Sequence, residues 1–122
     1  MTKNRSLPPL SPVRRAGDMV FISGQLPRQD DGTMRKGDIE AQTRQVIANL
    51  RKQLETQGLD LADVVKTTVW LTDGKLAPAF NAVYRETFPE PYPARTTVVS
   101  GLVADADIEL EAIATTRGAA SA

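Results

Sequence analysis

Residues 38–58 carry the longest regular pattern in the sequence. Apolar side chains recur there at spacings of three and four, which indicates an α-helix of about five turns with one apolar face. Asp38 is a preferred N-cap residue and Gly58 a preferred residue just past a helix end. The apolar face comprises Ile39, Thr43, Val46, Ile47, Leu50 and Leu54. Such a helix is stable only where a second surface covers that face.

The segments before and after this helix have the composition of β-strands. Residues 19–23 are β-branched and aromatic between two turn signals, and residues 64–72 are dense in β-branched side chains. In the later strand, alternation places Val65, Thr67, Val69 and Leu71 on one face and Lys66, Thr68 and Trp70 on the other. Residues 12–16 could form a short, exposed hairpin partner for the first strand.

The rest of the chain indicates a second helix followed by two strands. The helix starts at Asp73 or Gly74 and stops at the prolines after residue 88, and strands cover residues 95–100 and 107–115. This order is typical of an α+β domain, a mixed sheet with two helices packed on one face. We expect an extended lead-in over residues 1–16, one domain over 17–116 and a frayed tail over 117–122.

A sheet covered by helices on one side leaves its other face in need of a partner. That face has a mixed Thr and Val character, so we expect one of the two faces of strand 64–72 to meet a second copy of the chain. A monomer with an exposed, threonine-rich sheet is the alternative.

Composition excludes many kinds of active site. The 122 residues include no cysteine and no histidine, which excludes thiol nucleophiles, Ser–His dyads and His/Cys metal sites. The formal net charge is zero, without the basic excess typical of nucleic-acid binders. No segment has the long apolar run of a membrane span or signal peptide, so we expect a cytoplasmic protein without a membrane partner.

A few polar residues in the strands could carry chemistry. Arg95 follows Pro93–Ala94 at a strand start, where it could bind a carboxylate bidentately, although a surface charge is the commoner role. Glu109 and Glu111 face the same way in an apolar strand and could pair with basic side chains or hold a water against a ligand. Hydrolysis of an imine needs little more than water, a carboxylate anchor and a group that orients the water. The inventory therefore favours modest chemistry on a small anionic ligand, or binding without chemistry.

Five sequence blocks together resemble the RidA/YjgF family of reactive-intermediate deaminases. They are FISGQLP at 21–27, VKTTV at 65–69, FNAVY at 80–84, PARTT at 93–97 and IELEAIA at 108–114. The resemblance implies a chorismate-mutase-like fold and a homotrimer, its sheets forming a central barrel with ligand clefts between subunits. It also implies hydrolysis of 2-imino acids or their enamine tautomers, such as 2-aminoacrylate, to 2-oxo acids and ammonia, with no metal or cofactor.

The resemblance also assigns roles to single residues. Arg95 matches the arginine that holds the substrate carboxylate, and Glu109 matches the glutamate that orients the attacking water. The expected substrate-binding residues are Ser23, Gly24, Asn81 and Thr97, the last standing where many members have cysteine. The tyrosine that such members carry upstream of the Ser-Gly-Gln motif is missing.

Two other functions fit the same residues. A non-catalytic regulator that binds 2-oxo acids would use the same cleft and the same Arg95. Ribonuclease or translation-inhibitor activity ranks last, because the chain has no histidine and no basic stripe.

Overall fold

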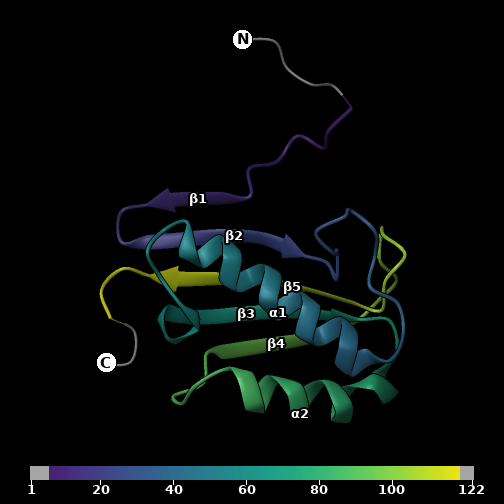
Figure 1. Ribbon diagram of the computed structural model, residues 1–122. Helices are drawn as coiled ribbons and strands as arrows, with labels where there is room; N and C mark the ends of the chain where they lie inside the picture. The colour runs from purple at the N-terminus through teal and green to yellow at the C-terminus, as the bar shows by residue number, and fades with distance from the viewer. Residues whose placement is uncertain (1–5, 119–122) are drawn as a thin grey trace.

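Two helices pack on one face of a five-stranded sheet in the computed structural model, which describes residues 6–118 (Figure 1). The strands are β1 (Val13–Ala16), β2 (Met19–Gln25), β3 (Val64–Leu71), β4 (Ala94–Val99) and β5 (Ile108–Thr115), and the helices are α1 (Ile39–Glu55) and α2 (Ala77–Thr87). The strand order is β1-β2-β5-β3-β4, with β3 and β4 parallel and the other pairs antiparallel. The expected α+β fold with a mixed sheet is therefore confirmed.

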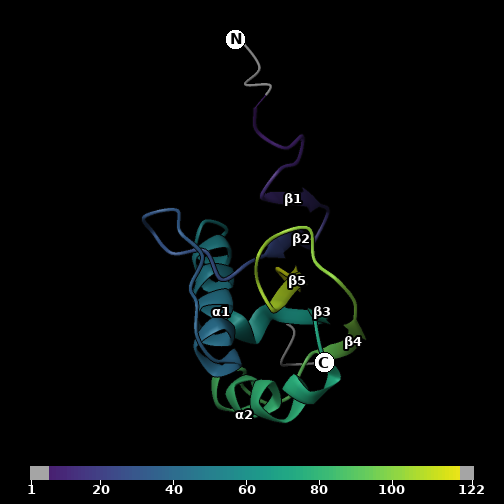
Figure 2. The ribbon, with the colours of Figure 1, turned by 90° about the vertical axis from the view of Figure 1, so that its right-hand side faces the viewer.

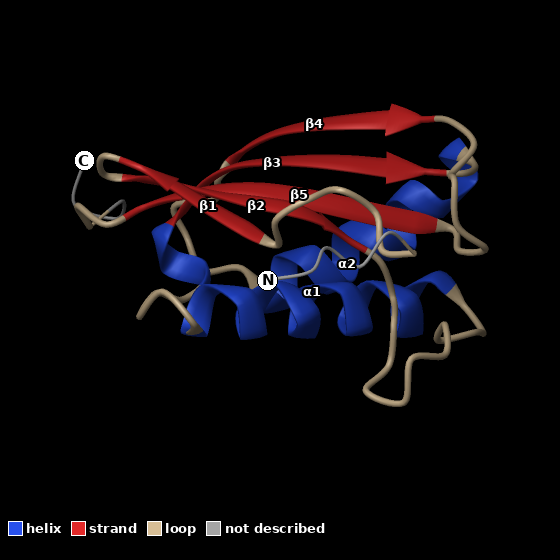
Figure 3. Ribbon diagram, turned by 90° about the horizontal axis from the view of Figure 1, so that it is seen from above, coloured by secondary structure: helices blue, strands red, loops and turns tan. Residues whose placement is uncertain are grey.

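Both helices lie on the same side of the sheet, and in the described chain no helix covers the other side (Figure 3). We call this uncovered side the open face. It carries the side chains that alternate with the buried ones, among them Phe21, Trp70, Val98, Glu109 and Glu111. Viewed along the strands, the loop between β4 and β5 rises from β4 and then arcs across the strand ends toward α1 (Figure 2), where Asp107 bonds Gln42 of α1.

Local capping fixes α1 where the sequence predicted. Asp38 accepts a hydrogen bond from the Ala41 N–H at its Oδ1, over 2.8 Å. At the other end Gly58 has φ +71°, and Leu59 N–H donates to Leu54 O while Gly58 N–H donates to Glu55 O. These two bonds form a Schellman motif, which needs the left-handed conformation that glycine adopts readily. All six residues of the predicted apolar face are buried.

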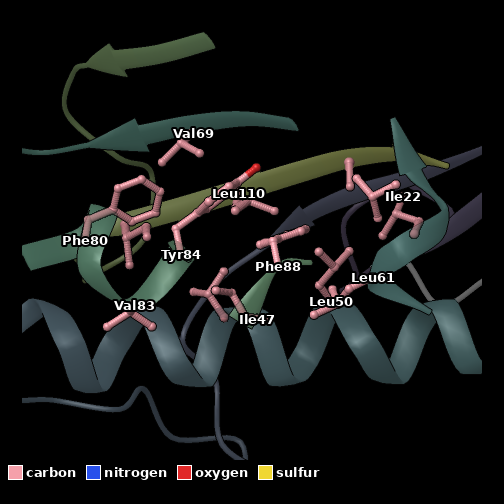
Figure 4. Packing of buried hydrophobic residues seen from close by; sticks show 14 of the residues in the cluster. Ile22, Ile47, Leu50, Leu61, Val69, Phe80, Val83, Tyr84, Phe88 and Leu110 are labelled. Atoms are coloured by element: carbon pink, nitrogen blue, oxygen red, sulfur yellow. The ribbon is translucent and has the colours of Figure 1, made fainter. Parts of the chain in front are cut away.

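The core fills the space between the helices and the covered side of the sheet (Figure 4). Alternate residues of β5 are buried, as predicted, and β3 contributes Thr67, Val69 and Leu71. The prediction that Val65 shares this face was wrong. A bulge between Val64 and Lys66 shifts the register against β5, so Val64 is buried instead and Val65 is only half-buried.

The N-terminal hairpin allowed by the sequence is present. β1 pairs with β2 through Val13 opposite Ile22 and Ala16 opposite Met19, so the sheet starts inside the stretch expected as a lead-in. Residues 1–5 and 119–122, including most of the expected tail, lie outside the described residues. Across residues 6–118 no helix has the length and apolar character needed to cross a membrane.

Candidate functional site

Arg95 lies over two aromatic rings of α2. Its strand neighbour in β3 is Thr67, which is buried beneath the helices, so Arg95 also points to the helix side. The guanidinium carbon lies 4.9 Å from the ring centroid of Tyr84 and 5.2 Å from that of Phe80. Both distances are within the range of cation–π attraction. The helix therefore holds a cation at the edge of the sheet without using a carboxylate.

The aromatic rings form a fixed support for this cation. Tyr84 and Phe80 are buried, and the Tyr84 hydroxyl makes a 2.9 Å hydrogen bond with Thr67 Oγ1. Burial raises the pKa of Tyr84, against the opposing effects of the Thr67 hydrogen bond and the Arg95 charge, so the ring remains neutral. The Arg95 guanidinium makes no hydrogen bond or ion pair with any of residues 6–118, so its N–H groups are available to a ligand.

A cavity of about 260 Å³ opens beside this arginine. Its walls are Asn81, Tyr84 and Arg85 of α2, Tyr92 and Pro93 of the preceding loop, and Arg95 of β4. The structure thus brings together Arg95 and Asn81, two of the predicted site residues. Thr97 pairs with the buried Val69, so it lies exposed on the same side of β4.

Glu109 lies on the open face of the sheet. It pairs with Trp70 and alternates with the buried Ile108 and Leu110. It lines a second cavity of about 210 Å³ with Trp70 and residues 100–103. Burial, and secondly the charge of Glu111, raises the pKa of Glu109. Within residues 6–118 this carboxylate has no hydrogen-bond or ion-pair partner, so it is available to bind water.

The Ser-Gly-Gln motif forms a bulge beside Glu109. Ile22 lies opposite Ala112 and Gln25 opposite Leu110, which leaves one extra residue on β2. A Cβ atom at Gly24 would collide with the carboxylate of Glu109, so glycine leaves the space that this carboxylate occupies. Ser23 instead holds the N-terminal segment, because its hydroxyl donates to Ser11 O over 2.6 Å and its N–H donates to Pro12 O.

The predicted site residues therefore form two groups. Arg95, Asn81 and Thr97 lie on the helix side, and we call them the arginine group; Glu109, Gly24 and the neighbouring Ser23 form the glutamate group at the open face. One chain does not bring the two groups together. Within residues 6–118 no three acidic side chains gather into a possible metal site.

Sequence reasoning missed several lining residues. It assigned Phe80 and Tyr84 to an apolar helix face, which is correct for their burial but omits their contact with Arg95. The signal for Arg85 was available, because it follows Asn81 by four residues and therefore lies on the same side of a helix. Tyr92 lies in a proline-rich loop whose path no periodicity predicts.

The model of the family described as endoribonuclease L-PSP matches residues 2–116. The chain belongs to this family. It is 46% identical over 117 residues to a RutC family protein of Pyrococcus horikoshii, covering 93% of each chain. It is 40% identical over 110 residues to the 3-aminoacrylate deaminase RutC of Acinetobacter baylyi, covering 88% of this chain and 87% of that one. The resemblance to RidA/YjgF proteins is thereby confirmed.

A solved structure of the family shows the same fold. RidA from an Antarctic Psychrobacter superposes with a TM-score of 0.85 at 36% identity, over 89% of each chain. The chain is thus a RidA-fold member of the L-PSP family, and its relatives include proteins named as deaminases.

Proposed function

We propose that this protein hydrolyses small 2-imino acids, or their enamine tautomers, to 2-oxo acids and ammonia. The observation that carries the proposal is the Arg95 guanidinium, which lies on aromatic rings beside a cavity and has no hydrogen-bond or ion-pair partner among residues 6–118. Such a group binds a carboxylate through two parallel hydrogen bonds. The deaminase named among the relatives supports the chemistry.

A complete site requires two chains. Arg95 and Glu109 lie on opposite faces of one sheet, so the arginine group of one subunit would face the glutamate group of the next. The open face of the sheet would form the contact between subunits, because Phe21 and Val98 expose 43% and 36% of their surface there. The proposed assembly is a homotrimer with the sheets around a central barrel.

The proposed reaction needs one base and no cofactor. Arg95 binds the substrate carboxylate, and Glu109 accepts a proton from water as the water oxygen attacks the imine carbon. The proton then passes to nitrogen, the C–N bond breaks, and ammonia leaves as the C=O bond forms. Both water hydrogens end on ammonia, and nothing is oxidised or reduced. The raised pKa of Glu109 makes it a stronger base than an ordinary carboxylate.

Cleavage of RNA, the activity in the family's description, is less well supported by the residues. The open face presents Glu109 and Glu111, which repel phosphate, and the chain as a whole has no net charge.

The test follows an imine made in situ by an amino-acid oxidase and trapped as its semicarbazone. Wild type should lower the amount of trapped imine, whereas Arg95→Ala and Glu109→Gln should not. Arg35→Ala, an exposed arginine in the loop before α1, is the matched control and should behave as wild type. Full activity in Arg95→Ala would disprove the role of that residue. An inactive wild type that still binds pyruvate through Arg95 would support the regulator instead.

A further inference from the structure

The cavity beside Arg95 contains a second arginine that the proposed reaction does not use. Arg85 follows Asn81 by four residues on the same side of α2, and both residues line the cavity. Arg95 enters it from β4. Two arginines on different elements therefore line one cavity of about 260 Å³.

Neither arginine is neutralised within the described chain. Glu86, the residue next to Arg85, instead forms a 2.8 Å ion pair with Arg44 of α1. The guanidinium of Arg85, like that of Arg95, makes no hydrogen bond or ion pair with any of residues 6–118. Like charges at one cavity repel each other and raise the local concentration of anions. A ligand with two negative groups would relieve this repulsion better than a ligand with one.

The size and lining of the cavity suit such a ligand. A water molecule occupies roughly 30 Å³ in the liquid, so a cavity of about 260 Å³ has room for several heavy atoms beyond one carboxylate. Asn81 and Tyr92 add a neutral amide and a hydroxyl to the wall, which can bind the polar atoms between two anionic ends.

We propose that the preferred substrates are dicarboxylic 2-imino acids, with Arg95 on the carboxylate next to the imine carbon and Arg85 on the distal carboxylate. This inference rests on the proposed function. The reaction is unchanged: water adds to the imine carbon, ammonia leaves, and the product is a 2-oxo dicarboxylate. Arg85 determines specificity and takes no part in the proton transfers.

The experiment compares two imines of the same reaction class. One is iminosuccinate, made from aspartate by an aspartate oxidase, and the other is 2-iminopropanoate, made from alanine by an amino-acid oxidase. Wild type should have the higher kcat/KM for iminosuccinate. Arg85→Gln should lower that value about tenfold, as expected for loss of one charge-assisted contact, and change the value for 2-iminopropanoate less than about twofold. Arg35→Gln removes the same charge elsewhere and should change neither.

Two results would overturn the inference while leaving the proposed function intact. One is turnover of 2-iminopropanoate with no preference for iminosuccinate, and the other is an equal loss for both imines in Arg85→Gln. A lower melting temperature with unchanged preference would make Arg85 a favourable charge in the last turn of α2 and nothing more.

A binding measurement tests the proposed dicarboxylate site independently of imine hydrolysis. If wild type hydrolyses neither imine, the proposed function fails, and calorimetry with oxaloacetate and pyruvate tests the cavity alone. Tighter binding of oxaloacetate that is lost in Arg85→Gln would support a dicarboxylate site without catalysis. Equal affinity for the two acids would overturn it.

Discussion

The contact between Gly24 and Glu109 couples a backbone position to a proposed base. A Cβ atom at Gly24 would collide with the end of the Glu109 side chain, which can move by rotation, and not with the main chain. We predict that Gly24→Ala changes the free energy of unfolding by less than about 1 kcal/mol but lowers imine turnover strongly, because the carboxylate is displaced. Denaturant unfolding and semicarbazone trapping on one preparation measure both. Unchanged turnover would show that the position of this carboxylate is irrelevant.

The charge of Glu111 gives a prediction about pH. Burial and the Glu111 charge both raise the pKa of Glu109, so turnover should fall on acidification at a pH above the ordinary glutamate value of 4.5. Glu111→Gln removes the repulsion and should move this acid limb to lower pH. Burial is the larger cause, so the acid limb of this variant should still lie above the ordinary glutamate value. A pH profile of kcat/KM measures it, and an unmoved limb would contradict the assignment of Glu109 as the base.

The raised pKa of Glu109 also determines how the stability of the folded chain depends on pH. Because the pKa of Glu109 is higher in the folded chain than in the unfolded one, the folded state binds this proton more tightly. The associated stability is fully present below the unfolded pKa and is lost as the pH rises through the raised value. Glu109→Gln should therefore raise the melting temperature at neutral pH and have little effect below about pH 4.

At the scale of elements, α2 contacts Arg95 of β4 through Phe80 and Tyr84, and the Tyr84 hydroxyl also bonds Thr67 of β3. Tyr84→Phe keeps the ring under Arg95 but leaves Thr67 without its hydroxyl partner, so it should cost about 1–2 kcal/mol of stability and change KM only slightly. Tyr84→Leu removes the ring and should raise KM by about tenfold with a smaller change in kcat. Equal KM values for the two variants would show that the ring does not position Arg95.

The sequence predicted the helices and strands better than the pairing between the strands. Asp38 and Gly58 mark α1 through bonds to residues within a few positions, which a local pattern can reveal. The bulge at Val65 was invisible, because strict alternation assumes an unbroken register with β5. That Arg95 and Glu109 point to opposite faces also depends on pairing between distant segments, namely Thr67 with Arg95 and Trp70 with Glu109.

At the scale of the whole molecule, the open face decides whether the site is complete. Val69 is fully buried in the core of one chain, so the face of β3 left for a second copy is the one with Trp70. We predict that Trp70→Glu leaves each chain folded but prevents assembly and abolishes turnover. Light scattering and circular dichroism test this together. A fully active monomer would refute a site made from two chains.

The placement of Arg95 and Glu109 on opposite sides of one sheet also has a genetic consequence. An Arg95→Ala subunit still offers an intact glutamate group to its neighbour, and a Glu109→Gln subunit still offers an intact arginine group. Two inactive variants should therefore complement each other when unfolded, mixed in equal amounts and refolded together. In a closed ring with random mixing, about a quarter of the sites receive both intact halves, so about a quarter of wild-type activity should return. Cells carrying both defective alleles would then keep an activity that neither allele supplies alone.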